Sequence, residues 1–228
     1  MRENLVVPSL VDVLYEAVRN RILTGELAAG TPLTEKEVAT SYDVARPTAK
    51  AALDRLITVG LLRRSINKTA RVPCMTADDI ADVYYSRGFL EREVMLALAI
   101  RQEIPAGARK AMQEMRDALA QHSLAALVEA DVAFHCALVD SLGSRRLSQM
   151  YLSVIGETQL CMAQVQSTQL LHADVIERQH QRLIEAIEGG NGPLAAEEIT
   201  EQLKEGCDRL VGDLRSQSPS APRVLQAK

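Results

Sequence analysis

From Thr76 onward, the chain contains only long segments with apolar residues at helical spacing, several of them bounded by Gly or Pro. The segments cover residues 76–102, 105–122, 124–142, 145–165, 170–188 and 193–214. Aromatic residues make up only 3% of the chain and Trp is absent, which favours helices over strands. Because short loops between helices make them antiparallel neighbours, the pattern predicts a bundle of six to seven helices.

The first 73 residues are organised differently. Ser9 is the predicted N-cap of a first helix, and Thr34 with Glu37 forms a capping box for a short second helix. A third helix is predicted from about 46 to 58. Residues 61–63 and 70–72 are two predicted short strands around the turn "INKT". Three helices and a two-stranded wing make a winged helix-turn-helix, so we expect a mainly α protein.

Three parts of the chain follow from these patterns. Residues 1–73 are predicted to be a winged helix-turn-helix domain and residues 74–215 an all-helical domain. The remaining residues, 216–228, are rich in Ser and Pro and are predicted to be disordered.

The start of the third helix carries polar side chains suited to DNA. In a helix-turn-helix, this end enters the major groove while the second helix crosses the phosphates. Arg contacts guanine through two hydrogen bonds, and Lys contacts phosphate. Residues 1–72 also carry 11 basic and 8 acidic residues, against 15 and 22 in residues 73–228. The predicted DNA-contacting residues are Lys36, Arg46, Thr48, Lys50, Asn67 and Lys68.

The run "VRNRILTGELAAGTPLTEKEVATSYDVARPTAKAALDRLITVGLL" resembles the N-terminal domain of GntR-family bacterial transcription regulators. The resemblance implies that Arg46 and the position of Lys50 contact operator DNA. Lys50 replaces an Arg of the family pattern, so phosphate contact is expected there instead of guanine recognition. Asp43 replaces the usual Gly of the turn, and Asp tolerates the left-handed conformation.

The stretch "EADVAFHCALVD" places Asp131 and His135 four residues apart, on one face of an apolar helix. "DVAFH" resembles the D-x-x-F-H motif of the FCD effector domain in the FadR branch of this family. "YYSRGFLE" places Arg87 and Glu91 on the R-x-x-L-E motif, and "QHQRLIEAI" places His180 on E-H-x-x-I. The resemblance therefore extends over the whole second domain.

Many FCD domains bind a divalent metal through one Asp and three His. The resemblance implies Asp131, His135 and His180 as ligands here, with zinc or nickel expected, while Gln202 occupies the fourth position. A Gln amide is a poor ligand for such metals, so we expect weaker binding than in a four-ligand site. Three protein ligands can still hold a metal when water or a bound molecule completes the shell. A hydrogen-bonded polar network without metal is the alternative.

Arg87 is the predicted effector-binding residue. An inward-facing Arg is costly unless it meets an anion. In relatives that match it, this Arg takes a ligand carboxylate, so the expected effector is a small carboxylate. A pair with Glu91 is the alternative role for Arg87. An acyl chain or acyl-CoA remains an alternative effector, because the bundle offers long apolar surfaces rich in Ala, Leu and Met.

Together these features predict a ligand-responsive DNA-binding transcription regulator, a repressor released by its ligand, acting as a homodimer on double-stranded operator DNA. A metal-dependent hydrolase and a protein-interaction adaptor are the rival classes. No catalytic residue is predicted, because no motif places a general base beside the metal-type ligands.

The predicted localisation is the cytoplasm. The four cysteines are widely spaced and form no C-x-x-C pair, which is typical of reduced thiols. No apolar run approaches the ~20 residues of a membrane span, and the N-terminus shows no signal peptide. The sequence leaves open the effector, the operator and the sign of regulation.

Overall fold

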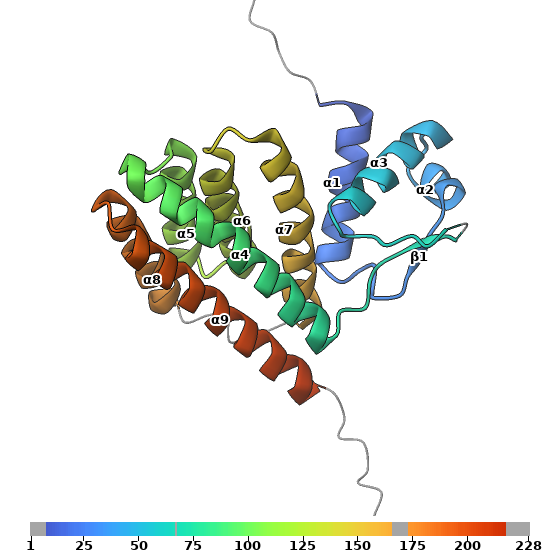
Figure 1. The fold of residues 1–228 in the computed structure, drawn as a ribbon. Helices are drawn as coiled ribbons and strands as arrows, with labels where there is room; N and C mark the ends of the chain where they lie inside the picture. The colour runs from blue at the N-terminus through green and yellow to red at the C-terminus, as the bar shows by residue number, and fades with distance from the viewer. Residues whose placement is uncertain (1–7, 67, 166–172, 218–228) are drawn as a thin grey trace, which may run out of the picture.

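The computed structural model describes residues 8–66, 68–165 and 173–217. The N-terminal unit contains α1 (Leu10–Leu23), β1 (Pro32–Leu33), α2 (Glu35–Ser41), α3 (Arg46–Thr58) and β2 (Ala70–Arg71). The bundle contains α4 (Ala77–Arg101), α5 (Ala106–Ala120), α6 (Leu124–Asp140), α7 (Arg145–Val165), α8 (Ala173–Glu188) and α9 (Gly192–Gln217). The predicted mainly helical fold, with a helical bundle after a winged helix-turn-helix, is confirmed (Figure 1).

The helices of the N-terminal unit begin where their capping residues predict. Ser9 and Asp12 form a reciprocal capping box at the start of α1, and Thr34 and Glu37 form another at α2. Asp43 adopts φ 50°, the left-handed turn conformation expected when it replaces Gly. These helices bury apolar side chains, including Leu14, Val18, Leu53 and Leu56, which belong to one hydrophobic core with those of the bundle.

The two-stranded antiparallel sheet is present, but its strands differ from the predicted pair. Pro32 pairs with Arg71 and Leu33 with Ala70. Of the predicted strand 61–63, Arg63 alone contributes, through an isolated bridge to Arg71. The backbone N–H groups of residues 61 and 62 instead bond to the carbonyl of Leu56 and complete the C-terminal turn of α3.

In the bundle, α4 runs alongside α9 and α5 packs against α6 (Figure 1). Thr76 caps α4 and Asp79 completes the capping box. The interior is apolar, with Phe134 and Leu138 of α6 fully buried. It also encloses charged and titratable side chains, among them Arg87, Glu91, His135 and His180, each at most 2% exposed. Buried groups of this kind need partners, and so they point to the site.

The end of α9 departs from the sequence prediction. The helix reaches Gln217, so residues 216 and 217 are helical although a disordered tail was predicted from 216. The rest of that tail, 218–228, and the start of the predicted fifth bundle helix, 170–172, lie outside the described residues. Among the helices that are described, none combines the length and apolar character that crossing a membrane would require.

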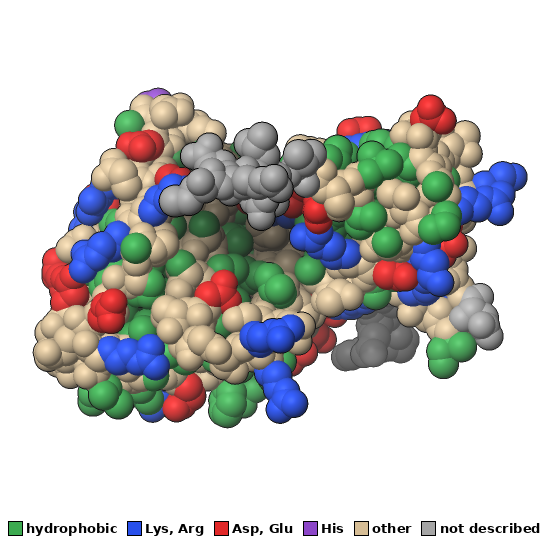
Figure 2. All heavy atoms as spheres, turned by 90° about the horizontal axis from the view of Figure 1, so that it is seen from above, with side chains coloured by type: hydrophobic (Ala, Val, Ile, Leu, Met, Phe, Trp, Pro, Cys, Tyr) green, Lys and Arg blue, Asp and Glu red, His purple; other side chains and the backbone are tan. Residues whose placement is uncertain are grey.

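The N-terminal unit contacts the bundle through α7 and α6. An ideal Cβ added to Gly156 of α7 would lie 1.9 Å from the carbonyl oxygen of Val59, so a glycine is needed for this close approach. Arg19 of α1 bonds Glu129 of α6 at 2.8 Å. Arg63 bonds Glu157 of α7 at 3.1 Å. Hydrophobic side chains are visible in the recess between the two units (Figure 2).

Candidate functional site

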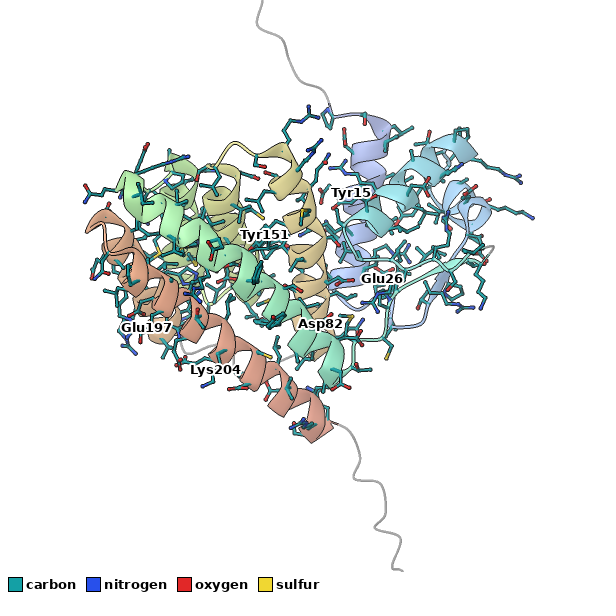
Figure 3. All side chains as sticks on the ribbon, viewed as in Figure 1. Tyr15, Glu26, Asp82, Tyr151, Glu197 and Lys204 are labelled. Carbon is teal, nitrogen blue, oxygen red and sulfur yellow. The ribbon has the colours of Figure 1, made fainter. Side chains whose placement is uncertain are left out.

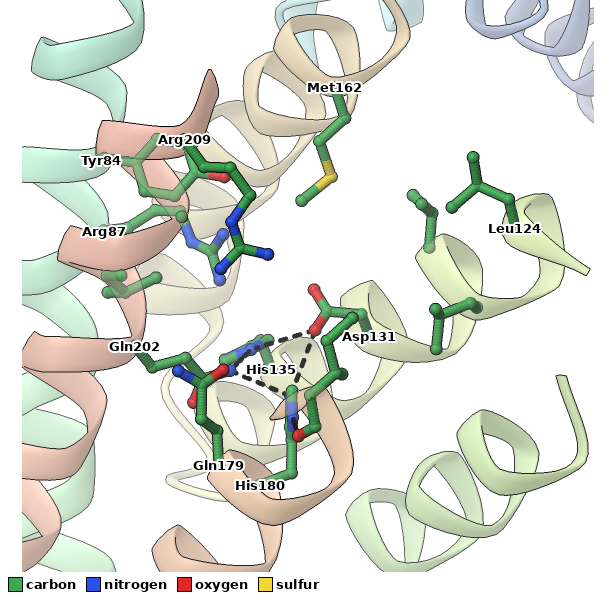
Figure 4. Close-up of a pocket in the computed structure, with 15 residues that line it drawn as sticks. Tyr84, Arg87, Leu124, Asp131, His135, Met162, Gln179, His180, Gln202 and Arg209 are labelled. Atoms are coloured by element: carbon green, nitrogen blue, oxygen red, sulfur yellow. Dashed lines mark hydrogen bonds and ion pairs between the residues drawn. The ribbon is translucent and has the colours of Figure 1, made fainter. Parts of the chain in front are cut away.

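The three predicted metal ligands converge inside the bundle, although they come from two helices. Asp131 and His135 lie on α6 and His180 lies on α8, and one ligand atom from each falls within 4.8 Å of the others. Gln202 of α9 closes the group, and all four line one pocket (Figure 4). His135 and His180 are 45 residues apart in the chain, but α8, which packs against α9, α4 and α5, brings His180 to the two residues of α6.

The backbone determines which nitrogen of His180 carries the proton. Nδ1 of His180 lies 2.8 Å from the carbonyl oxygen of Ile176, which can only accept a hydrogen bond, so Nδ1 donates. In the neutral ring, Nε2 then presents a lone pair. This atom lies 3.2 Å from Oδ1 of Asp131 and 3.1 Å from Nε2 of Gln202. The lone pair and the carboxylate oxygen repel each other unless a cation lies between them.

His135 is oriented by Glu91. Its Nδ1 lies 2.8 Å from Oε2 of Glu91, close enough for an ion pair but not aligned for a straight hydrogen bond. The carboxylate favours N–H at Nδ1, which directs the lone pair of Nε2 toward Oδ1 of Asp131 at 3.8 Å. A carboxylate or carbonyl behind each ring is the arrangement that orients metal-binding histidines in proteins.

Gln202 is the departure from the expected ligand set. Its amide nitrogen lies 3.1 Å from Nε2 of His180 and 3.5 Å from Nε2 of His135, while its buried Oε1 has no hydrogen-bond partner. In this orientation the amide N–H groups occupy the two lone pairs that a metal would use. A half-turn of the amide exchanges nitrogen for oxygen and turns Oε1, the ligand atom, toward the cluster.

A second buried layer surrounds Glu91. Oε1 of Glu91 accepts hydrogen bonds from Nε of Arg87 and from the hydroxyl of Tyr151, each at 2.7 Å. Figure 3 shows Tyr151 pointing into the bundle from α7. Burial alone raises the pKa of Glu91, but the charge of Arg87 and the contact with His135 outweigh it and lower the pKa to about 2. Burial likewise opposes ionisation of Asp131, but His180, His135 and Arg87 around it keep the pKa of this carboxyl well below its usual range.

Arg87 forms the ion pair that was the alternative prediction for it. Its Nε pairs with Glu91, as in the ion-pair interpretation, while its buried Nη2 has no hydrogen-bond partner. The side chain is 2% exposed and lines the same pocket as the metal-type cluster. An unmet buried donor of a cation is a place where an anionic group would be stabilised.

The pocket also contains residues that the sequence reasoning missed. Arg209 lies seven residues, or two helical turns, after Gln202 on α9, so both side chains fall on one face. This spacing in the sequence could have indicated that Arg209 lies on the same side of α9 as Gln202. Tyr84 of α4 and Met162 of α7 complete the rim near Arg209 (Figure 4).

Only some of the predicted DNA-contacting residues lie on one common surface. Lys36 of α2, Arg46 of α3 and Lys68 line one open hollow beside the wing, together with Arg64, which was not predicted. Lys50 is exposed and Thr48 is half-buried, and neither lines this hollow. Asn67 lies outside the described residues. Four basic residues around one hollow make a surface suited to the phosphate backbone.

Comparisons with known proteins agree with this architecture. Residues 10–72 match the gntR family of bacterial regulatory proteins, and residues 82–205, more than half of the chain, match the FCD domain. The chain is 24% identical to the HTH-type transcriptional regulator YdhC of Bacillus subtilis over 86% of its own length and 88% of that protein. It is 29% identical to the HTH-type transcriptional regulator BphR of Paraburkholderia xenovorans, over 65% of its own length. That alignment spans 64% of BphR, less than two thirds of the relative.

The fold is shared with a solved GntR transcriptional regulator from Rhodococcus sp. RHA1. The TM-score is 0.75 at 22% identity, covering 90% of this chain and 99% of that one. At this identity the likeness concerns the fold and not the ligand.

Proposed function

Because the chain belongs to the gntR family of bacterial regulatory proteins and carries an FCD domain, we propose that it is a transcription regulator that binds operator DNA and senses a small carboxylate. The environment of Arg87 supports a carboxylate as the effector. Its guanidinium is buried in the pocket with one nitrogen unpaired, beside the cluster of Asp131, His135 and His180. The cavity measures about 70 Å³, which favours a small acid over the alternative acyl chain.

The ligand set fits a divalent cation, and zinc or nickel is the proposed metal. Asp131, His135 and His180 would hold it, since two Nε2 lone pairs and a carboxylate oxygen face one point. When bound, the metal would supply a Lewis-acidic centre for an oxygen of the effector. Glu91 and the carbonyl of Ile176 hold the two rings in the required tautomers.

Metal analysis of untagged protein tests this part. We expect zinc or nickel in the protein as purified, or uptake of either when it is added, and loss of both in His135→Ala. His122→Ala is the matched control, because His122 is exposed at the end of α5. Absence of metal and absence of affinity for added zinc and nickel would contradict the metal proposal and leave a metal-free polar network.

For DNA, two copies would each place one α3 in the major groove of a pseudo-palindromic site. The proposed contacts are Lys36, Arg46, Thr48, Lys50 and Lys68, with Arg64 added by the structure. Asn67 stays a prediction. Gel-shift titration of the gene's own upstream region should show binding that weakens steeply with salt and is lost in Arg46→Ala. Arg109→Ala, on exposed α5, is the matched control. Equal binding by Arg46→Ala would refute this DNA-binding surface.

The proposed regulation is repression relieved by the effector. A ligand changes DNA affinity only through its preference for one arrangement of the two units. Glu129, the partner of Arg19 in the N-terminal unit, lies on α6 two residues before Asp131. A shift of α6 on ligand binding would therefore reach the DNA-binding unit directly. Reporter expression with and without the effector decides the sign, and activation by the effector-bound form would contradict repression.

A further inference from the structure

The pocket contains two guanidinium groups, and neither has a full set of partners. Arg87 uses Nε for Glu91 and leaves its buried Nη2 without a partner. Arg209 has no hydrogen bond or ion pair among the described residues. Figure 4 shows both side chains pointing into the pocket, one from α4 and one from α9. Two cationic groups with unused donors therefore face the same cavity.

Glu91 already bonds Nε of Arg87 and is not part of the pocket lining. Of the described residues that line the pocket, Asp131 alone is acidic, and its Oδ1 faces His180. One carboxylate satisfies one guanidinium fork through two parallel hydrogen bonds. A single carboxylate on Arg209 would leave Nη2 of Arg87 unpaired, and buried donors without acceptors are costly. Two incompletely paired guanidiniums match a ligand with two carboxylates.

We propose that the effector is a small dicarboxylate, with one carboxylate held by Arg209 and the other reaching Nη2 of Arg87. This inference rests on the proposed carboxylate-sensing function and makes Arg209 the residue that determines specificity. A monocarboxylate satisfies one arginine and leaves the other unpaired, so it binds more weakly.

Calorimetric titration with acids of equal chain length tests the proposal. Succinate and butyrate form one pair, and malonate and propionate form another. We expect wild type to bind the better diacid at least about 10-fold more tightly than its monoacid partner, the scale of one charge-assisted bidentate contact. Arg209→Gln should remove this preference, because the diacid then loses its second guanidinium and is weakened more than the monoacid. Arg215→Gln, on the exposed end of α9, should behave as wild type.

The possible outcomes distinguish failure of the dicarboxylate proposal from failure of the proposed carboxylate-sensing function. Equal binding of diacid and monoacid by wild type, or an unchanged preference in Arg209→Gln, overturns the dicarboxylate proposal and leaves carboxylate sensing intact. If wild type binds no acid of either kind, both proposals fail. Thermal melting of each variant shows whether the fold is retained, and Arg209→Lys, which keeps the charge without the fork, should retain part of the preference.

The outer face of α4 carries a second feature. Tyr85 is 75% exposed and Phe89 is 68% exposed, although the chain has only two Phe and the other, Phe134, is fully buried. The groove that these two aromatics share with α9 also contains Gly88, Leu203 and Cys207. Exposed aromatic residues beside an apolar groove are typical of a protein–protein interface.

The charges flanking these aromatics are arranged symmetrically. Asp82 lies three residues before Tyr85, and Arg92 lies three residues after Phe89, so the four positions are symmetric about residue 87. Asp82 and Arg92 are exposed and have no ion pair among the described residues. Figure 3 shows Asp82 on α4 and Lys204 on the neighbouring α9. In an antiparallel pair of such helices, each Asp82 meets Arg92 of the other copy and each Tyr85 meets Phe89.

We infer that this face binds a second copy of the same chain, with the two α4 helices antiparallel about a two-fold axis. A two-fold interface uses the same patch on both copies, and the order acid–aromatic–aromatic–base satisfies that requirement in this one direction. The inference specifies the surface of the proposed homodimer.

Charge reversal with sedimentation analysis tests the surface. Asp82→Arg and Arg92→Asp should each raise the dimer Kd at least about 10-fold, because each places two like-charge pairs in the dimer. Mixing the two variants should restore a dimer, since both charged pairs of the mixed dimer then join a base of one variant to an acid of the other. Asp140→Arg, on the exposed end of α6, is the control and should not change the Kd.

Wild-type-like dimers in both reversed variants, or no dimer on mixing them, overturn this surface. A wild-type protein that stays monomeric at all concentrations overturns it as well. Gel-shift with the upstream region then shows separately whether operator binding survives. Circular dichroism of each single variant confirms that a lost dimer is not a lost fold.

Discussion

Glu91 should be the most sensitive single position in the bundle. Its side chain is fully buried, accepts hydrogen bonds from Arg87 and Tyr151, and orients His135. Glu91→Ala leaves the guanidinium of Arg87 buried without its counter-ion. We therefore expect a large loss in the free energy of unfolding, well above that of an exposed ion pair.

Two estimates of the magnitude agree. Breaking a buried ion pair by removing one partner typically costs about 3–5 kcal/mol. The pKa of Glu91 falls from its ordinary value of 4.5 to about 2, a difference worth about 3 kcal/mol. The lost bond from Tyr151 adds about 1 kcal/mol.

Urea unfolding at pH 7, followed by circular dichroism, measures the loss. The informative control is the double variant Arg87→Met with Glu91→Leu, which replaces the ion pair by apolar side chains of similar size. It should recover most of the stability, since no unpaired charge remains. A loss below about 1 kcal/mol in Glu91→Ala, or a double variant no more stable than Glu91→Ala, would refute the reasoning.

The remaining predictions concern pH, the contact between the units and DNA. Because the pKa of folded Glu91 lies below its unfolded value, its contribution to stability is complete above pH 4.5 and is lost as the pH falls toward 2. Urea midpoints at pH 7, 4 and 3 should show this loss, and the apolar double variant should show less of it. Gly156→Ala should lower the melting temperature, because the new Cβ meets the carbonyl of Val59, whereas Gly212→Ala, with open space around it, should not. Arg64→Ala should reduce the slope of log affinity for DNA against log salt by about 1, as expected for one phosphate contact, and an unchanged slope would remove Arg64 from the interface.

Local signals in the sequence predicted the parts of the fold that depend on neighbours along the chain. The capping residues Ser9 and Thr34, and the turn at Asp43, act within a few positions and were found where expected. The pairing of β1 with β2 was missed because it joins residues nearly 40 positions apart, and residues 61 and 62 were instead used by the end of α3.

The site residues show the same difference between local signals and long-range contacts. Asp131 and His135 were recognisable because they share one helical face and a family motif. The Glu91–Tyr151 bond joins residues 60 positions apart, and no periodicity predicts which tyrosine meets which acid. The seven-residue spacing from Gln202 could have placed Arg209 on the same face of α9. That spacing predicts a pocket residue only when this face of α9 is known to line the pocket.

The central claim is that a carboxylate in the bundle pocket changes DNA binding by the N-terminal unit. The direct measurement is the Kd for the gene's own upstream DNA, with and without saturating dicarboxylate, in wild type and in Arg87→Gln. The account predicts a change of at least about 5-fold in wild type, the scale of a typical allosteric coupling, and no change in Arg87→Gln. DNA affinity that is the same with and without every acid that binds, or an equal response in Arg87→Gln, would contradict it.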